Sequence, residues 1–208
     1  RACQSGTSLN VFGTELVFKI SWIRADKEYG GHSSLTQSGS IHRAKDLYAK
    51  GQYEAARAIF EKHLEQHPDS MDTFHALIAT LVALKEYTEL RRRLQRALMK
   101  QPDDVVLLCQ LGLCELESDN IGPAKTYFRA AMEKAPDFLP SYLHLSELEY
   151  QTGAYDDAIR VARKGVFVDE QCVPLHMTLG RAARMASQPE LARRHWRRAL
   201  YHDPKNLD

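Results

Sequence analysis

The side chains in this sequence that could do chemistry by type and spacing are two histidines and two cysteines. His63 and His67 lie four residues apart, which would place both imidazoles on one face of a helix, as in helical metal sites. No third ligand accompanies them. Cys109 and Cys114 lie five residues apart, so on a helix they would point about 140° away from each other. We therefore expect no metal site and no local disulfide.

The usual motifs of catalysis and cofactor binding are missing from the sequence. There is no glycine-rich phosphate loop, no nucleophile elbow and no pair of carboxylates between a strand and a helix. No apolar run approaches the roughly 20 residues that a membrane-spanning helix needs. A count of 28 Lys and Arg against 27 Asp and Glu gives no strong overall attraction to nucleic acid or membrane. The sequence therefore predicts no enzyme, no catalytic residue and no cofactor.

The most regular feature of the sequence is the spacing of four of its eight prolines. They fall at positions 68, 102, 136 and 204, so successive position numbers differ by 34, 34 and twice 34. From Gln37 the chain divides without insertion into five units of this length, 37–70, 71–104, 105–138, 139–172 and 173–206. Equivalent positions keep their character. In one column four of five residues are small, as two closely packed helices require: Ala56, Leu90, Ala124, Ala158 and Ala192. Another column is bulky, with Leu77, Leu111, Leu145 and Leu179.

Each unit contains two stretches with the apolar spacing of an amphipathic helix. In the second unit these are 71–84 and 88–100, separated by a short turn. A helix–turn–helix unit with small-residue columns, a recurring tyrosine and a closing proline resembles the tetratricopeptide repeat family. The resemblance covers 37–206 and implies an all-α fold, an α-solenoid of five tandem repeats with a groove along the first helices.

The resemblance also implies a function in binding other proteins, with a partner peptide or helix held in the concave groove. The middle of the groove is apolar and its C-terminal end carries arginines, so we expect a partner with apolar anchors and an acidic flank. An alternative is that some of its leucines pack internally. The predicted groove residues are Ile41, Lys45 and Tyr48; His75, Ala79 and Val82; Cys109, Leu113 and Leu116; Leu143, Glu147 and Tyr150; and Met177, Arg181 and Arg184.

One branch of the family clamps the C-terminal carboxylate of chaperones with lysine, asparagine and arginine side chains. The matching positions here hold Ile41, Lys45, Ala76, Val106 and Gln110, which do not make such a clamp. A chaperone tail is therefore not an expected partner.

Two arginine-rich runs, 91–96 and 193–198, are the most basic stretches of the sequence. Basic residues beside an aromatic ring, such as Trp196 here, can bind RNA or an acidic protein. In helical repeats such residues more often form the solvated outer face of the second helices. Nucleic acid is therefore not an expected partner.

Residues 1–36 do not fit the repeat and form a predicted N-terminal extension. Residues 11–24 alternate Leu16, Phe18, Ile20 and Trp22, which is typical of a strand. A lone strand must pair with other backbone. We consider the end of a preceding β domain, a segment packed on the repeats, and a strand donated to a partner's sheet. Residues 30–39 are rich in Gly and Ser and predict a linker.

The C-terminal end also leads to an expectation about assembly. Residues 207–208 begin a continuation or tail, and the sequence shows no capping helix after the fifth unit. We expect that more chain, an oligomer or a partner covers the apolar end of the last helix pair.

Three functions fit these observations. The first is a non-catalytic scaffold or adaptor within a multiprotein assembly. The second is the substrate-recruiting repeat region of a larger enzyme, such as a transferase. The third is a bacterial envelope-assembly lipoprotein anchored at Cys3, because Ala2-Cys3 and the polar residues after it resemble a lipoprotein cleavage region. Few, scattered cysteines favour a cytoplasmic or otherwise intracellular location, whereas the third function predicts the periplasm or outer membrane.

Overall fold

The computed structural model describes residues 35–204, with side chains from residue 39 onward, and this part of the chain consists of helices and short turns. The predicted strand at 11–24, Cys3 and the tail at 207–208 lie outside the described residues. Helix α2 begins at Leu35, so residues 35–39, which we predicted as linker, are helical. Extending an existing helix by a few residues without proline costs little, because nucleation has already occurred.

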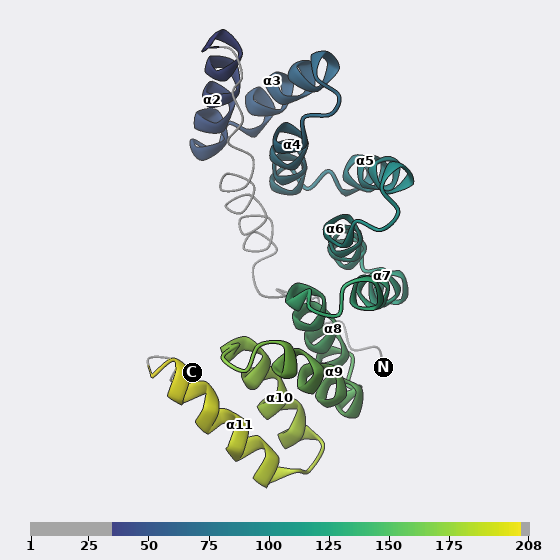
Figure 1. Ribbon diagram of the computed structural model, residues 1–208, viewed down its shortest axis with the longest axis vertical. Coiled ribbons are helices and arrows are strands. Elements are labelled where there is room, and N and C mark those ends of the chain that lie inside the picture. The colour runs from purple at the N-terminus through teal and green to yellow at the C-terminus, as the bar shows by residue number, and fades with distance from the viewer. Residues whose placement is uncertain (1–34, 205–208) are drawn as a thin grey trace, which may run out of the picture. The chain divides into compact units, whose positions relative to one another are not determined.

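Ten helices follow one another through residues 35–204 (Figure 1). Two successive helices fall in each of the five units. Their bounds are α2 Leu35–Ala49, α3 Tyr53–Gln66, α4 Met71–Ala83, α5 Tyr87–Lys100, α6 Val105–Glu117, α7 Ile121–Lys134, α8 Leu139–Gln151, α9 Tyr155–Val168, α10 Val173–Met185 and α11 Pro189–His202.

The turn inside each helix pair contains one residue with left-handed backbone. The φ angles are +76° at Gly51, +60° at Lys85, +59° at Asp119, +78° at Gly153 and +58° at Ser187. These residues occupy equivalent positions of the five units, so every repeat turns with the same geometry. Glycine occupies two of the five positions. In the other three a side chain is held in a region that non-glycine residues rarely adopt.

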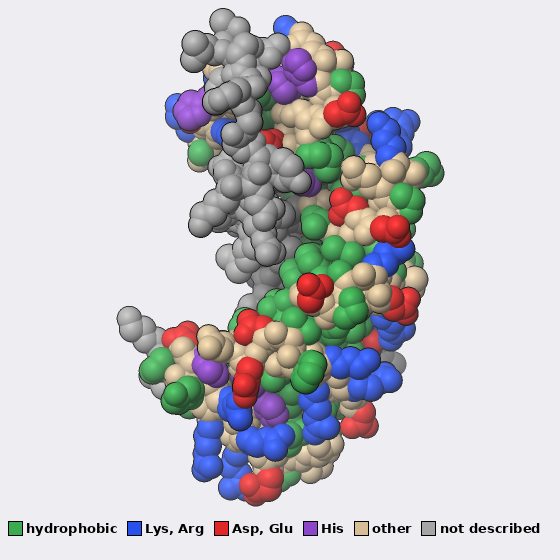
Figure 2. Space-filling view, in the orientation of Figure 1, with side chains coloured by type: hydrophobic (Ala, Val, Ile, Leu, Met, Phe, Trp, Pro, Cys, Tyr) green, Lys and Arg blue, Asp and Glu red, His purple; other side chains and the backbone are tan. Residues whose placement is uncertain are grey.

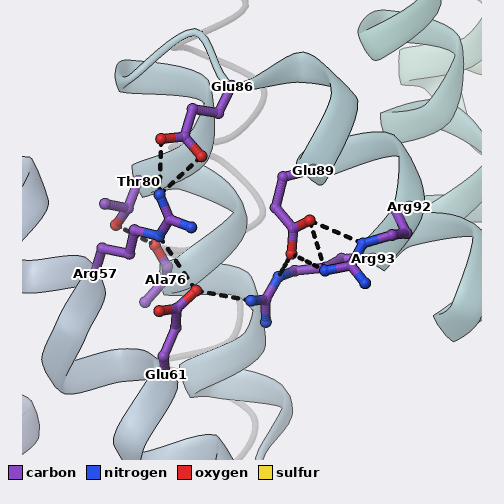
Figure 3. A network of polar contacts seen from close by, with 8 residues as sticks. All are labelled: Arg57, Glu61, Ala76, Thr80, Glu86, Glu89, Arg92 and Arg93. Atoms are coloured by element: carbon purple, nitrogen blue, oxygen red, sulfur yellow. Dashed lines mark hydrogen bonds and ion pairs between the residues drawn. The ribbon is translucent and has the colours of Figure 1, made fainter.

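The chain divides into two compact units, residues 1–93 and 94–208. In the described part of the first unit, Phe60, Leu77 and Leu81 form the centre of the core and are almost completely buried. A network of ion pairs links α3 to α5 and to the turn before it (Figure 3). Its bonds within the first unit run from Arg57 to Glu61 and Glu86, and from Arg93 to Glu61 and Glu89.

In the second unit, the small-residue columns let pairs of helices approach closely. A Cβ added to Gly112 on α6 would lie only 2.5 Å from Cε1 of Phe128 on α7, and Phe128 is fully buried. The buried carboxylate of Glu149 on α8 accepts bonds from Lys125 at 2.6 Å and Arg129 at 2.8 Å, both on α7. Close packing thus joins α6 to α7, and a buried ion pair joins α7 to α8.

These observations confirm the all-α helical repeat predicted from the sequence. Among the helices of residues 35–204, none combines the length and the apolar composition that crossing a membrane would require.

Candidate partner-binding face

The first helices of the last two repeats, α8 and α10, pack against each other, and a buried carboxylate joins them. Glu147 on α8 is 5% exposed, and its Oε2 lies 2.5 Å from Nη2 of Arg181 on α10. The same oxygen accepts a hydrogen bond of 2.9 Å from the hydroxyl of Thr178. The other oxygen accepts one of 3.2 Å from Gln151. A buried charge with this many donors is held in one position.

The guanidinium of Arg181 is held from a second side by an aromatic ring. Its Cζ lies 4.8 Å from the ring centroid of Tyr150, the distance of a cation–π contact. Tyr150 in turn packs against the buried cluster of Ala158, Ile159 and Ala182. The core of the last two repeats therefore fixes the ring, and the ring and Glu147 together fix Arg181.

Around this pair the same two helices offer accessible side chains. Leu143 and Met177 are half-buried, while Arg184, one turn after Arg181, is exposed. We refer to Leu143, Tyr150, Met177, Arg181 and Arg184 as the inner face of α8 and α10. It combines two apolar side chains with an arginine whose charge faces solvent.

The predicted groove residues on α6 have a different environment. Leu113 is completely buried, and Cys109 and Leu116 are buried as well. Burial raises the pKa of the Cys109 thiol to about 12, so it is an unreactive core thiol. In this conformation the three side chains belong to the packed interior, and binding by them would require them to become accessible.

In the first two repeats the predicted groove residues are all half-buried. They are Ile41, Lys45 and Tyr48 on α2, and His75, Ala79 and Val82 on α4. The ring of Tyr48 meets that of Tyr53 edge-on, with 5.2 Å between the centroids. These residues remain a predicted binding surface.

The two histidines with metal-ligand spacing are engaged in other contacts. Their rings lie 4.7 Å apart, and Nδ1 of His63 is 3.0 Å from the hydroxyl of Thr73. Within the described part of the chain, no three His, Cys, Asp or Glu side chains are arranged to hold a metal ion.

A buried histidine pair near the C-terminal end was not predicted from the sequence. Nε2 of His176 lies 2.9 Å from the carbonyl oxygen of Glu170, which can only accept, so this nitrogen carries the proton. Nδ1 of neutral His176 must then accept from Nδ1 of His195, also 2.9 Å away. This leaves Nε2 of His195 unprotonated and buried, with no hydrogen-bond partner in the described residues.

The environment of this pair keeps His195 neutral. Its pKa is lowered to about 4 by burial, and further by the neighbouring His176 and by the positive charges of Arg194, Arg163 and Arg198. His144, buried beside Phe128, also has its pKa lowered to about 4 by burial. No sequence motif marks these histidines, because each occurs in one repeat only.

Comparison with known proteins identifies the repeat. Residues 47–108 match the family model described as tetratricopeptide repeat. The helix pairs, their regular spacing and this match agree. Residues 47–108 belong to the tetratricopeptide repeat family, and the helix pairs of residues 35–204 have the fold of its repeats. We call the two-helix units described above repeats, and the inner face of α8 and α10 lies on the first helices of repeats four and five.

Two curated proteins resemble parts of this repeat chain. It is 30% identical over 92 residues to the rhomboid protease GluP of Bacillus subtilis, covering 44% of this chain and 18% of that protein. It is 25% identical over 189 residues to the CTR9 homolog of Arabidopsis thaliana, covering 79% of this chain and 17% of that protein. The chain thus spans less than a fifth of the length of these relatives.

Solved structures share the fold at low sequence identity. The crystal structure of MamA protein superposes with a TM-score of 0.66 at 17% identity, covering 82% of this chain and 93% of that one. TTC0263, a thermophilic tetratricopeptide repeat protein of Thermus thermophilus, gives 0.60 at 18% identity, with coverages of 83% and 94%. These similarities concern the fold alone.

Proposed function

We propose that this tetratricopeptide repeat chain is a non-catalytic interaction module that binds a peptide or helix of a partner protein along its first helices, as a scaffold or adaptor. The observation that carries the proposal is the inner face of α8 and α10. There Glu147 and Tyr150 fix Arg181, and Leu143, Met177 and Arg184 remain accessible beside it.

The chemistry of this face indicates the kind of partner. Arg184 is exposed and would pair with a carboxylate of the partner. Met177 and Leu143 would contact apolar side chains of the partner, one or two helical turns from that carboxylate. Arg181 is already paired with Glu147 inside the protein. It therefore contributes to the shape of the inner face and to its positive potential, rather than a free ion-pair partner. A segment with apolar anchors followed by Asp or Glu fits both properties.

Selection from a random peptide library on the whole chain tests this proposal. We expect the selected peptides to combine apolar anchors with acidic residues and to lose affinity for the Arg184→Glu variant. Lys50→Glu reverses one exposed charge at the end of α2 and is the matched control. Selected peptides that bind wild type and both variants equally would contradict the assignment of this face.

A second candidate is a repeat region that recruits substrate for a larger enzyme. It is favoured by the short part of each curated relative that the chain matches, one of those relatives being a protease. In this case the peptide selected on the repeats would resemble a substrate of the attached domain. Assaying the full-length protein for turnover of that peptide separates the two candidates.

A further inference from the structure

The second helices of the last two repeats present the same exposed pattern. On each helix three basic residues and one aromatic residue are spaced i, i+3, i+4 and i+7, which places them on one helix face. All eight side chains are exposed. We call them the basic–aromatic face: Arg160, Arg163, Lys164 and Phe167 on α9, and Arg194, Arg197, Arg198 and Tyr201 on α11. Each residue of α9 has its counterpart one repeat later on α11.

The two helices that carry these residues have a common neighbour. Both α9 and α11 pack against α10. The charges of Arg163 on α9 and of Arg194 and Arg198 on α11 all reach His195 on α11 and lower its pKa. Figure 2 shows Lys and Arg side chains gathered over the C-terminal helices.

Most of the positive charge on this face is not neutralised. Arg160 pairs with Asp157 and Arg198 with Glu170. Arg163, Lys164, Arg194 and Arg197 form no ion pair with any residue that the structure describes. Mutual repulsion of neighbouring cations is unfavourable, and an anionic ligand would relieve it.

The other arginine run of the sequence differs in this respect. Arg92 binds Glu89, and Arg93 binds both Glu61 and Glu89, so this run serves the packing of its own repeats (Figure 3). Arg96 of that run is exposed and forms no ion pair with a described residue, whereas α9 and α11 together hold four such cations.

Two aromatic rings project from the same end of this face. Phe167 is 94% exposed and Tyr201 is 81% exposed. Beside Tyr201 lies an open hollow of about 490 Å³. Its lining residues are Glu170, Gln171, Arg197, Arg198, Tyr201 and His202. The rings of Tyr201 and His202 meet edge-on, 5.2 Å apart. Flat π faces next to arginines are therefore available.

We propose that the basic–aromatic face binds single-stranded nucleic acid. The four unneutralised cations would contact phosphates, and the rings of Phe167 and Tyr201 would stack on bases. An acidic peptide would use the cations, but it has no bases to stack on the exposed faces of both rings. Glu170 lies in the hollow, but its charge is compensated by Arg198. This inference is independent of the peptide face on α8 and α10.

Fluorescence anisotropy of the whole 208-residue chain with a labelled uridine homopolymer of about 20 nucleotides tests the charge contribution. Four phosphate contacts predict that the logarithm of the binding constant falls with the logarithm of salt concentration with a slope of about −3. Arg163→Glu with Arg197→Glu should weaken binding and reduce this slope by about half. Lys62→Glu with Arg96→Glu reverses two exposed charges on the second helices of repeats one and two. This control should leave the affinity and the salt slope unchanged.

The aromatic contribution has its own variant. Phe167→Ala with Tyr201→Ala removes two exposed rings, so folding should be preserved, and affinity should fall about tenfold or more with an unchanged salt slope. Absence of binding, or equal binding by all variants, would overturn the proposal. Displacement of the RNA by polyglutamate at equal charge concentration would assign the face to acidic proteins. Recruitment to anionic vesicles but not to RNA would assign it to membranes.

Discussion

Glu147 and Arg181 occupy the same position of successive repeats, and their side chains form an ion pair between α8 and α10. The equivalent residues of the earlier repeats are Lys45, Ala79 and Leu113. The fourth and fifth repeats thus carry opposite charges at one position, and the two charged members neutralise each other. The pair fixes the geometry of the proposed peptide face.

Breaking this pair should destabilise the last two repeats. Arg181→Met leaves the buried carboxylate of Glu147 without its cation, and we expect a loss of about 2 kcal/mol in the free energy of unfolding. Glu147→Gln in the same chain removes the uncompensated charge and should recover most of the loss. Urea denaturation of wild type, both single variants and the double variant measures the coupling. Additive effects would mean that the two groups do not interact in solution.

The close approach of α6 and α7 predicts a different kind of loss. Gly112→Ala places a methyl group against the buried ring of Phe128, so we expect destabilisation of about 1–3 kcal/mol. Gly122→Ala is the matched control, because no atom lies within 4 Å of its added Cβ. The control should be neutral or slightly stabilising, since alanine favours a helix. Equal melting temperatures for the two variants would show that the helices are not packed this closely.

The repeated turn predicts a stabilising substitution. Ser187 adopts φ +58° at the position where Gly51 and Gly153 have +76° and +78°. Ser187→Gly should raise the free energy of unfolding by up to about 1 kcal/mol, because the steric cost of the left-handed conformation disappears. Gly153→Ala should lower it by a similar amount. Thermal unfolding compares the two, and a change of the same sign in both would refute a shared turn geometry.

The buried histidines predict sensitivity to acid. The pKa values of His144 and His195 are about 4 in the folded chain, below the ordinary value of 6.5. The unfolded chain therefore binds more protons between pH 6.5 and 4, so stability should be complete above pH 6.5 and should fall as the pH drops to 4. Each histidine contributes about 3 kcal/mol at most to this fall. His144→Phe should reduce the pH dependence measured by urea denaturation, and an unchanged dependence would contradict its burial.

Much of the fold could be predicted from the sequence because the repeat supplies the same information five times. The helix pairs, the turn and the small residues at Gly112 and Gly180 all follow from columns of equivalent residues. The beginning of α2 at Leu35 was predicted wrongly, because local composition does not show how far a packed helix extends.

The site was less predictable, for identifiable physical reasons. Leu113 occupies an inward column, but an apolar residue is equally suited to a groove and to the core, and here it is buried. The two arginine runs have similar composition. In the first run Arg93 has Glu61 as a partner from the preceding repeat, while in the second run Arg194 and Arg197 have none within residues 39–204. Such pairing becomes visible only when the repeats are stacked.

The most direct test of the proposed function is isothermal titration of the whole chain with a peptide selected on it, comparing wild type with the Met177→Ser, Arg184→Glu double variant. Both substituted side chains lie on α10 and are at least partly accessible, so helicity should be unchanged. We predict that wild type binds the peptide and that the double variant loses at least about tenfold in affinity, because it lacks an apolar contact and a charge pair. Equal affinity, with both proteins folded, would place the partner elsewhere and contradict the account.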